Sequence, residues 1–148
     1  MTDDRIERDT LIAAPLERVW DLVARPGWWA ADGEHETGTM AVPGESTVAR
    51  HSEYGDFPIR VESVEPQTYV AYRWASAFPG EEVRAENSTL VEFTLTAEGD
   101  QTRLRVVESG FGSLPTTEEN RQRAVSDNTG GWGECLEFAR KRTEHALK

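Results

Sequence analysis

The chain has 148 residues, of which five are tryptophan and one is cysteine, and its formal net charge is −11 at pH 7. This length is typical of a single domain, predicted here to span residues 1–148. The lone cysteine, Cys135, excludes an intramolecular disulfide. An acidic surface repels phosphate groups, so we expect no nucleic-acid partner. No apolar run opens the chain or approaches the roughly 20 residues of a membrane span, so we expect no membrane insertion and a cytoplasmic location.

The N-terminal part predicts a strand followed by two short helices. Residues 5–12 alternate polar and apolar side chains, as a strand does. Pro15 can occupy the first turn of a helix that continues to about Ala24, and the segment 25–27 (RPG) ends it. Residues 28–31 (WWAA) predict a short second helix or turn. Adjacent side chains on a helix diverge, so one of Trp28 and Trp29 should line the mouth of a cavity. The other should be exposed or at an interface, which leaves monomer and homodimer both open.

Five antiparallel strands are predicted next, at 47–54, 59–65, 69–75, 88–96 and 102–109, separated by Gly, Pro and Asp in turn-like segments. Alternate apolar residues give each strand one buried face. A sheet with one buried face needs a cover, and residues 116–147 predict a long helix that supplies it. The order of strand, short helices, consecutive strands and long helix is typical of an α+β fold.

The join between the last strand and the last helix is the most informative segment. Glu108 has the same strand parity as Leu104 and Val106, which predicts a carboxylate on the buried face with a raised pKa. Gly130 and Gly131 interrupt a helical pattern at a cost of roughly 1 kcal/mol each. A helix accepts glycine where another backbone approaches closely, or where a side chain would block a cavity.

Five short segments occur in a recognisable order: 13–20 (AAPLERVW), 26–29 (PGWW), 72–74 (YRW), 107–111 (VESGF) and 128–132 (NTGGW). With the order of elements, they resemble the helix-grip superfamily, also called START-like or SRPBCC. Within it the chain is most similar to the family named for homologues of the activator of the heat-shock protein 90 ATPase. The resemblance implies a curved antiparallel sheet wrapped around the C-terminal helix, with an elongated apolar cavity between them. It does not imply one function, because the superfamily includes lipid carriers, receptors and cyclases.

No motif predicts a catalytic centre, a metal site or a cofactor. Three scattered histidines lack metal-ligand spacing, and no glycine-rich nucleotide motif or nucleophile elbow is present. His51 has no fixed acid–base partner in sequence, and Cys135 has no adjacent base. We therefore predict no catalytic residue, no metal and no cofactor.

The predicted function is binding of a small apolar or aromatic molecule in the cavity between the sheet and the C-terminal helix. One alternative is a cyclase- or hydrolase-type enzyme that uses the same cavity, and another, which we favour less, is a chaperone ATPase regulator. The predicted ligand-binding residues are those expected to face the space between sheet and helix: Trp28, Trp29, His51, Tyr72, Trp74, Phe93, Glu108, Phe111, Asn128, Gly131, Trp132 and Cys135.

Overall fold

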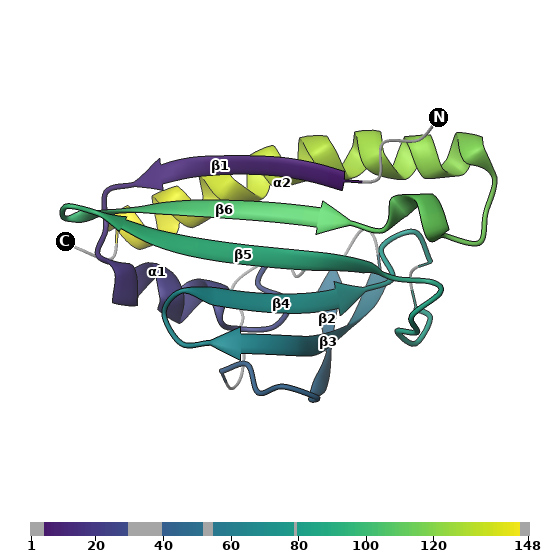
Figure 1. Cartoon of the computed structure of the whole chain (residues 1–148), viewed down its shortest axis with the longest axis horizontal. Coiled ribbons are helices and arrows are strands. Elements are labelled where there is room, and N and C mark those ends of the chain that lie inside the picture. Colours follow the sequence, from purple (N-terminus) through teal and green to yellow (C-terminus); the bar gives the residue numbers. More distant parts are fainter. Residues whose placement is uncertain (1–4, 30–39, 52–54, 79, 146–148) are drawn as a thin grey trace.

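The computed structural model describes residues 5–29, 40–51, 55–78 and 80–145. Six strands form one antiparallel sheet in the order β1-β6-β5-β4-β3-β2, and the long helix α2 runs behind β1 (Figure 1). The predicted α+β architecture is confirmed. The elements are β1 Arg5–Ile12, α1 Leu16–Val23, β2 Ser46–His51, β3 Gly55–Glu65, β4 Tyr69–Trp74, β5 Thr89–Glu98, β6 Gln101–Ser109, the 3₁₀ turn η1 Phe111–Ser113, and α2 Glu118–His145.

The strand boundaries differ from the predicted ones mainly between β2 and β3. Gly55 and Asp56, predicted to form a turn, are instead the first residues of β3, where Gly55 pairs with His51. Gly55 has φ +93°, a value that glycine adopts without the strain of a side chain. The last three residues of the predicted strand, 52–54, lie outside the described residues.

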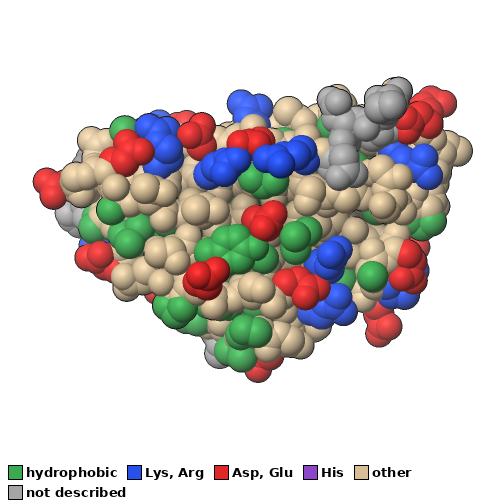
Figure 2. Space-filling view, viewed as in Figure 1, with side chains coloured by type: hydrophobic (Ala, Val, Ile, Leu, Met, Phe, Trp, Pro, Cys, Tyr) green, Lys and Arg blue, Asp and Glu red, His purple; other side chains and the backbone are tan. Residues whose placement is uncertain are grey.

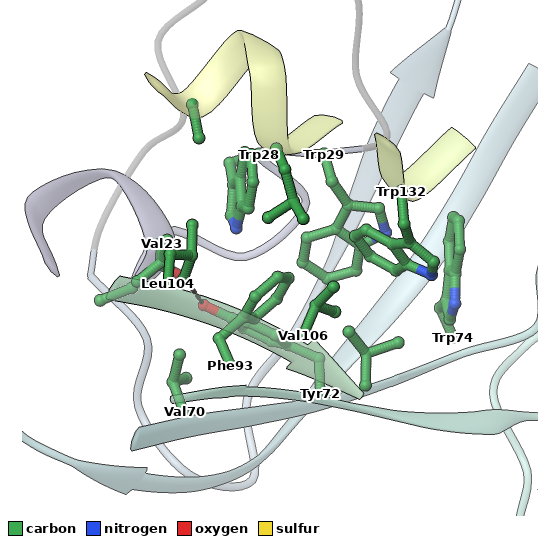
Figure 3. Packing of buried hydrophobic residues seen from close by; sticks show 14 of the residues in the cluster. Val23, Trp28, Trp29, Val70, Tyr72, Trp74, Phe93, Leu104, Val106 and Trp132 are labelled. Atoms are coloured by element: carbon green, nitrogen blue, oxygen red, sulfur yellow. Dashed lines mark hydrogen bonds between the residues drawn. The ribbon is translucent and has the colours of Figure 1, made fainter. Parts of the chain in front are cut away.

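The core lies between the inner face of the sheet and the helices, as the alternating pattern predicts. Figure 3 shows Val70, Phe93, Leu104 and Val106 from the sheet facing Val23 of α1, and each of these side chains is fully or almost fully buried. Burial of each such side chain contributes about 1.5–3 kcal/mol.

The outer face of the sheet is polar. Arg103 pairs with Asp9 on β1 at 3.2 Å and with Glu98 at 2.7 Å, and Arg73 pairs with Glu62 across β4 and β3 at 3.1 Å. In Figure 2, basic and acidic side chains are accordingly interspersed on this face. These pairs are partly exposed and contribute little stability each, but they keep the outer face solvated.

The segment after α1 takes the turn rather than the helix of the two predicted alternatives. Residues 24–29 form consecutive bends and turns, and residues 30 and 31 lie outside the described part. Trp28 and Trp29 are 3% and 9% exposed, so the prediction that only one of them faces inward is wrong. The turn frees the two side chains from helical spacing, and their rings meet edge to face at 6.2 Å. Neither position supplies the exposed tryptophan that would have favoured a homodimer.

Gly27 determines how this turn enters the core. Its φ is +85°, and a Cβ there would lie 2.9 Å from the Cβ of Ala49 on β2. Only glycine fits here, because any other residue would be strained at this positive φ and its Cβ would collide with β2. The sequence Gly27-Trp28-Trp29 therefore anchors two indoles against the sheet.

Helix α2 begins with an N-cap at Thr117, whose Oγ1 accepts a hydrogen bond from the backbone N–H of Asn120 at 3.1 Å. The middle of the helix is attached to β1 through Arg8, which donates to the carbonyl of Thr129 at 3.3 Å. Near its end, Glu144 accepts a hydrogen bond from the backbone N–H of Ala13 at 2.9 Å. Within the described ranges, no helix is both long and apolar enough to cross a lipid bilayer.

Candidate ligand-binding cleft

A cleft of about 860 Å³ lies between the middle of α2 and the sheet. The sheet side and the turn after α1 contribute Trp29, His51, Phe57, Trp74 and Ser76, and α2 contributes Ser126, Asp127, Asn128, Gly130, Gly131, Trp132, Glu134 and Cys135. Both polar and aromatic groups therefore reach the same space.

The two adjacent glycines leave one wall of the cleft open. A Cβ built at Gly130 or Gly131 would meet no heavy atom within 4 Å beyond their immediate helical surroundings. Close approach of another described segment therefore does not account for the pair. We therefore attribute the two glycines to the cleft, which a side chain at either position would narrow.

The aromatic wall of the cleft is held together by ring contacts around Trp29. Its ring centroid lies 5.0 Å from Tyr72, 5.5 Å from Trp74, 5.5 Å from Phe93 and 5.9 Å from Trp132 (Figure 3). Such pairs contribute about 0.5–1.5 kcal/mol each beyond the area that they bury. The indoles that face the cleft are thus held by a packed aromatic cluster.

Glu108 lies behind this wall and fixes it by hydrogen bonds. Its Oε2 accepts from the indole N–H of Trp74 at 2.8 Å and from the hydroxyl of Thr89 at 2.5 Å. Its Oε1 accepts from the indole N–H of Trp132 at 2.7 Å. The amide nitrogen of Asn128 lies 3.1 and 3.3 Å from the two oxygens. One carboxyl group therefore connects β4, β5 and α2 through four residues, of which Trp74, Asn128 and Trp132 line the cleft.

The carboxyl group of Glu108 is fully buried, as its strand parity predicts. Burial raises the pKa of Glu108, while the four hydrogen-bond donors oppose that shift. Among the described residues, no Lys or Arg forms an ion pair with Glu108. Desolvation is the larger effect, so the predicted rise in pKa is confirmed in direction.

The structure separates the predicted site residues into two groups. Residues that line the cleft are Trp29, His51, Trp74, Asn128, Gly131, Trp132 and Cys135. The other predicted site residues are buried and are not part of the lining: Trp28, Tyr72, Phe93, Glu108 and Phe111. The hydroxyl of Tyr72, for example, donates to the carbonyl of Val23 at 2.6 Å. Burial raises the pKa of Tyr72, which keeps that hydroxyl protonated as a donor.

Several lining residues were missed by the sequence prediction. Asp127 and Glu134 lie four and three positions from Gly131, so helical spacing alone could have placed them on the same wall, and Gly130 directly precedes Gly131. Ser126 lies four positions before Gly130 on the same helix and could have been found in the same way. Phe57 and Ser76 carried no comparable signal, because their positions depend on how the sheet curves toward the helix.

The reactive groups of the lining do not form a catalytic set. Burial raises the pKa of the Cys135 thiol to about 12, so the nucleophilic thiolate is scarce near neutral pH. Its Sγ lies 3.5 Å from the backbone carbonyl of Trp29, a contact that suits a protonated thiol. Across the residues that the structure describes, no group of three or more His, Cys, Asp and Glu side chains could hold a metal ion.

Comparisons with known proteins agree with this architecture. The family model described as "Activator of Hsp90 ATPase homolog 1-like protein" matches residues 13–140. No curated protein matches the chain in sequence.

Three solved structures illustrate the shared fold. Protein MLL2253 from Mesorhizobium loti is 21% identical, with 93% of this chain and 94% of that chain covered and a TM-score of 0.69. The Aha1 dimer from Colwellia psychrerythraea is 18% identical, with 95% and 96% covered and a TM-score of 0.69. DynU16, a putative protein in the dynemicin biosynthetic locus, is 23% identical with a TM-score of 0.65; 92% of this chain is covered but 47% of that one. At these identities the likeness shows that the chains share the helix-grip fold, and it shows nothing about their ligands.

Proposed function

The chain belongs to the Activator of Hsp90 ATPase homolog 1-like family, and we propose that it binds a small apolar or aromatic molecule between the sheet and α2. The observation that carries the proposal is the cleft itself, which Trp29, Trp74 and Trp132 line together. Its volume of about 860 Å³ falls in the usual range of about 300–1,000 Å³ for small-molecule sites. A ligand that buries roughly 200 Å² of apolar surface there would gain about 5 kcal/mol, at 25 cal/mol per Å².

Asn128 is the polar group best placed to orient such a ligand. Its amide nitrogen is committed to Glu108 and to the hydroxyl of Ser76, the latter at 3.0 Å. Its carbonyl oxygen accepts no hydrogen bond from the described residues, although the side chain lines the cleft. A ligand N–H or O–H would satisfy this oxygen.

Two features favour binding over catalysis. A general acid or base must come within about 2.6–3.2 Å of the proton that it transfers, and Glu108 lies behind the indoles with both oxygens occupied. Cys135, the one thiol, is held in its protonated form. Membership of the family does not by itself carry chaperone regulation to this chain, so we favour ligand binding over that role.

The test is uptake of Nile red, a neutral apolar dye whose emission rises in apolar surroundings. Gly131→Leu should place a side chain in the open space of the cleft and lower dye affinity at least about tenfold while the protein stays folded. Gln122→Leu is the control, because it adds the same side chain to an exposed position of the same helix outside the cleft. Native mass spectrometry of freshly purified protein would show any retained molecule. Equal dye binding by wild type and a folded Gly131→Leu variant would refute the proposal.

A further inference from the structure

The carboxylates of the cleft lining are those of Asp127 and Glu134. Asp127 and Glu134 project from α2 on either side of the glycine pair, about 10 Å apart along the helix axis. Neither forms an ion pair with another described residue, and no Lys or Arg is among the described residues of the lining. Carboxylates elsewhere on α2 do pair, as Glu119 does with Arg123 at 3.4 Å and Glu144 with Arg140 at 3.1 Å.

Asn128 adds to this acceptor character. The Asn128 carbonyl oxygen is without a described donor, whereas both hydrogens of its amide are directed at Ser76 and Glu108. The orientation of the amide follows from chemistry, because a carboxylate can only accept. The Asn128 carbonyl oxygen therefore adds a neutral acceptor to the two carboxylates of the lining.

The indoles themselves favour positive charge. Trp74 and Trp132 each donate their N–H to the same buried carboxyl group, at 2.8 and 2.7 Å. Such a bond polarises the donor and increases the electron density of the ring. Tryptophan is already the aromatic side chain that best attracts a cation over its face, by about 0.5–2 kcal/mol. Behind the aromatic wall, therefore, Glu108 makes two indoles better partners for a cation.

From this combination we propose that the ligands of the cleft are organic cations, in which an amine or quaternary ammonium group is carried on an apolar or aromatic body. The inference rests on the proposed function and specifies its ligand class. The tryptophan wall contacts both the apolar body and the cationic group, and the carboxylates of Asp127 and Glu134 add a negative potential along the α2 side of the cleft. The net charge of −11 supports the same selectivity, because it raises the local concentration of cations around the protein.

The experiment compares two probes of the same shape by isothermal titration calorimetry. One is (3-hydroxyphenyl)trimethylammonium, and the other is 3-tert-butylphenol, in which a neutral carbon replaces the charged nitrogen. We expect the cation to bind at least about fivefold more tightly than its neutral isostere at low salt. The preference should shrink as sodium chloride screens the carboxylates.

The variant Asp127→Asn/Glu134→Gln should weaken cation binding severalfold and leave binding of the neutral probe unchanged. Glu119→Gln is the control, because it removes one negative charge from the same helix outside the cleft. If the neutral isostere binds as tightly as the cation, the inference fails while the proposed function stands. An equal loss of cation affinity in Glu119→Gln would overturn it too, because net charge alone would then explain the preference. If neither probe binds at millimolar concentration, both the inference and the proposed function fail.

Discussion

Replacement of Glu108 by glutamine tests the network that holds the cleft wall in place. Glutamine keeps the shape of the side chain but has one acceptor oxygen in place of two. Whichever way its amide is turned, the indole N–H of either Trp74 or Trp132 faces an amide nitrogen. A buried donor without an acceptor costs about 1–3 kcal/mol, and where Glu108 is protonated it carries no charge whose removal would offset that cost. We expect net destabilisation of about 1–3 kcal/mol under mildly acidic conditions.

The destabilisation should depend on pH with a defined sign. Burial raises the pKa of Glu108 above its ordinary value of 4.5. The protonated form is thus favoured by folding, and the stability that this adds is fully present below pH 4.5. It is lost as pH rises through the folded-state pKa. Because glutamine does not titrate, the stability difference between wild type and Glu108→Gln should narrow from pH 5 to pH 8.

Urea denaturation followed by circular dichroism at 222 nm measures both effects without relying on tryptophan emission. Glu119→Gln is a matched control, since the same change at an exposed position should alter the free energy of unfolding by less than about 0.5 kcal/mol. A Glu108→Gln variant that matches this control at pH 5 and pH 8 would refute the network described above.

Three further changes test the supporting geometry. Gly27→Ala should destabilise the protein by about 1–2 kcal/mol because of the positive φ, and by about 1–3 kcal/mol more because its Cβ collides with Ala49. Urea denaturation measures the loss, and a change below about 0.5 kcal/mol would contradict the tight turn. Gly131→Ala should instead stabilise the protein by about 0.5–1 kcal/mol, since its Cβ meets open space. Calorimetry should show a Tm about 2–4 °C higher, and a lower Tm would mean that other atoms already occupy the space beside Gly131. Cys135, with a thiol pKa of about 12, should react with a disulfide reagent at pH 8 at least about tenfold more slowly in the folded protein than in urea, and equal rates would argue against its burial.

Strand periodicity predicted the sheet and its buried face well, because alternation in the sequence translates directly into sides of the sheet. It placed Glu108 inside the protein from its parity with Leu104 and Val106. It could not distinguish the cleft from the packed core. Tyr72 and Trp74 share a parity, yet Tyr72 is sealed at 0% exposure while Trp74 reaches the cleft. The difference depends on the distance between α2 and the sheet at each position. The residue pattern of one strand contains no information about that distance.

The two adjacent tryptophans show a second limit. Helical spacing does not apply to Trp28 and Trp29, because residues 24–29 form turns. The turn depends on Gly27, whose positive φ and contact with Ala49 involve a strand more than twenty residues further along the chain. A Pro-Gly pair signals a turn but does not say where the following side chains point. By contrast, the helical neighbours Asp127 and Glu134 were within reach of sequence reasoning, because they share a helix face with Gly131.

The most direct test of ligand binding in the cleft is a heteronuclear NMR titration that observes the indole N–H signals, assigned by Trp→Phe substitutions. The protein is titrated with (3-hydroxyphenyl)trimethylammonium and with 3-tert-butylphenol. The signals of Trp29, Trp74 and Trp132 should shift in step with ligand occupancy, because these three side chains line the cleft. Trp20 lies on α1 outside the lining and should not shift. Shifts confined to Trp20, or no shift of any indole at saturating probe, would contradict binding in this cleft.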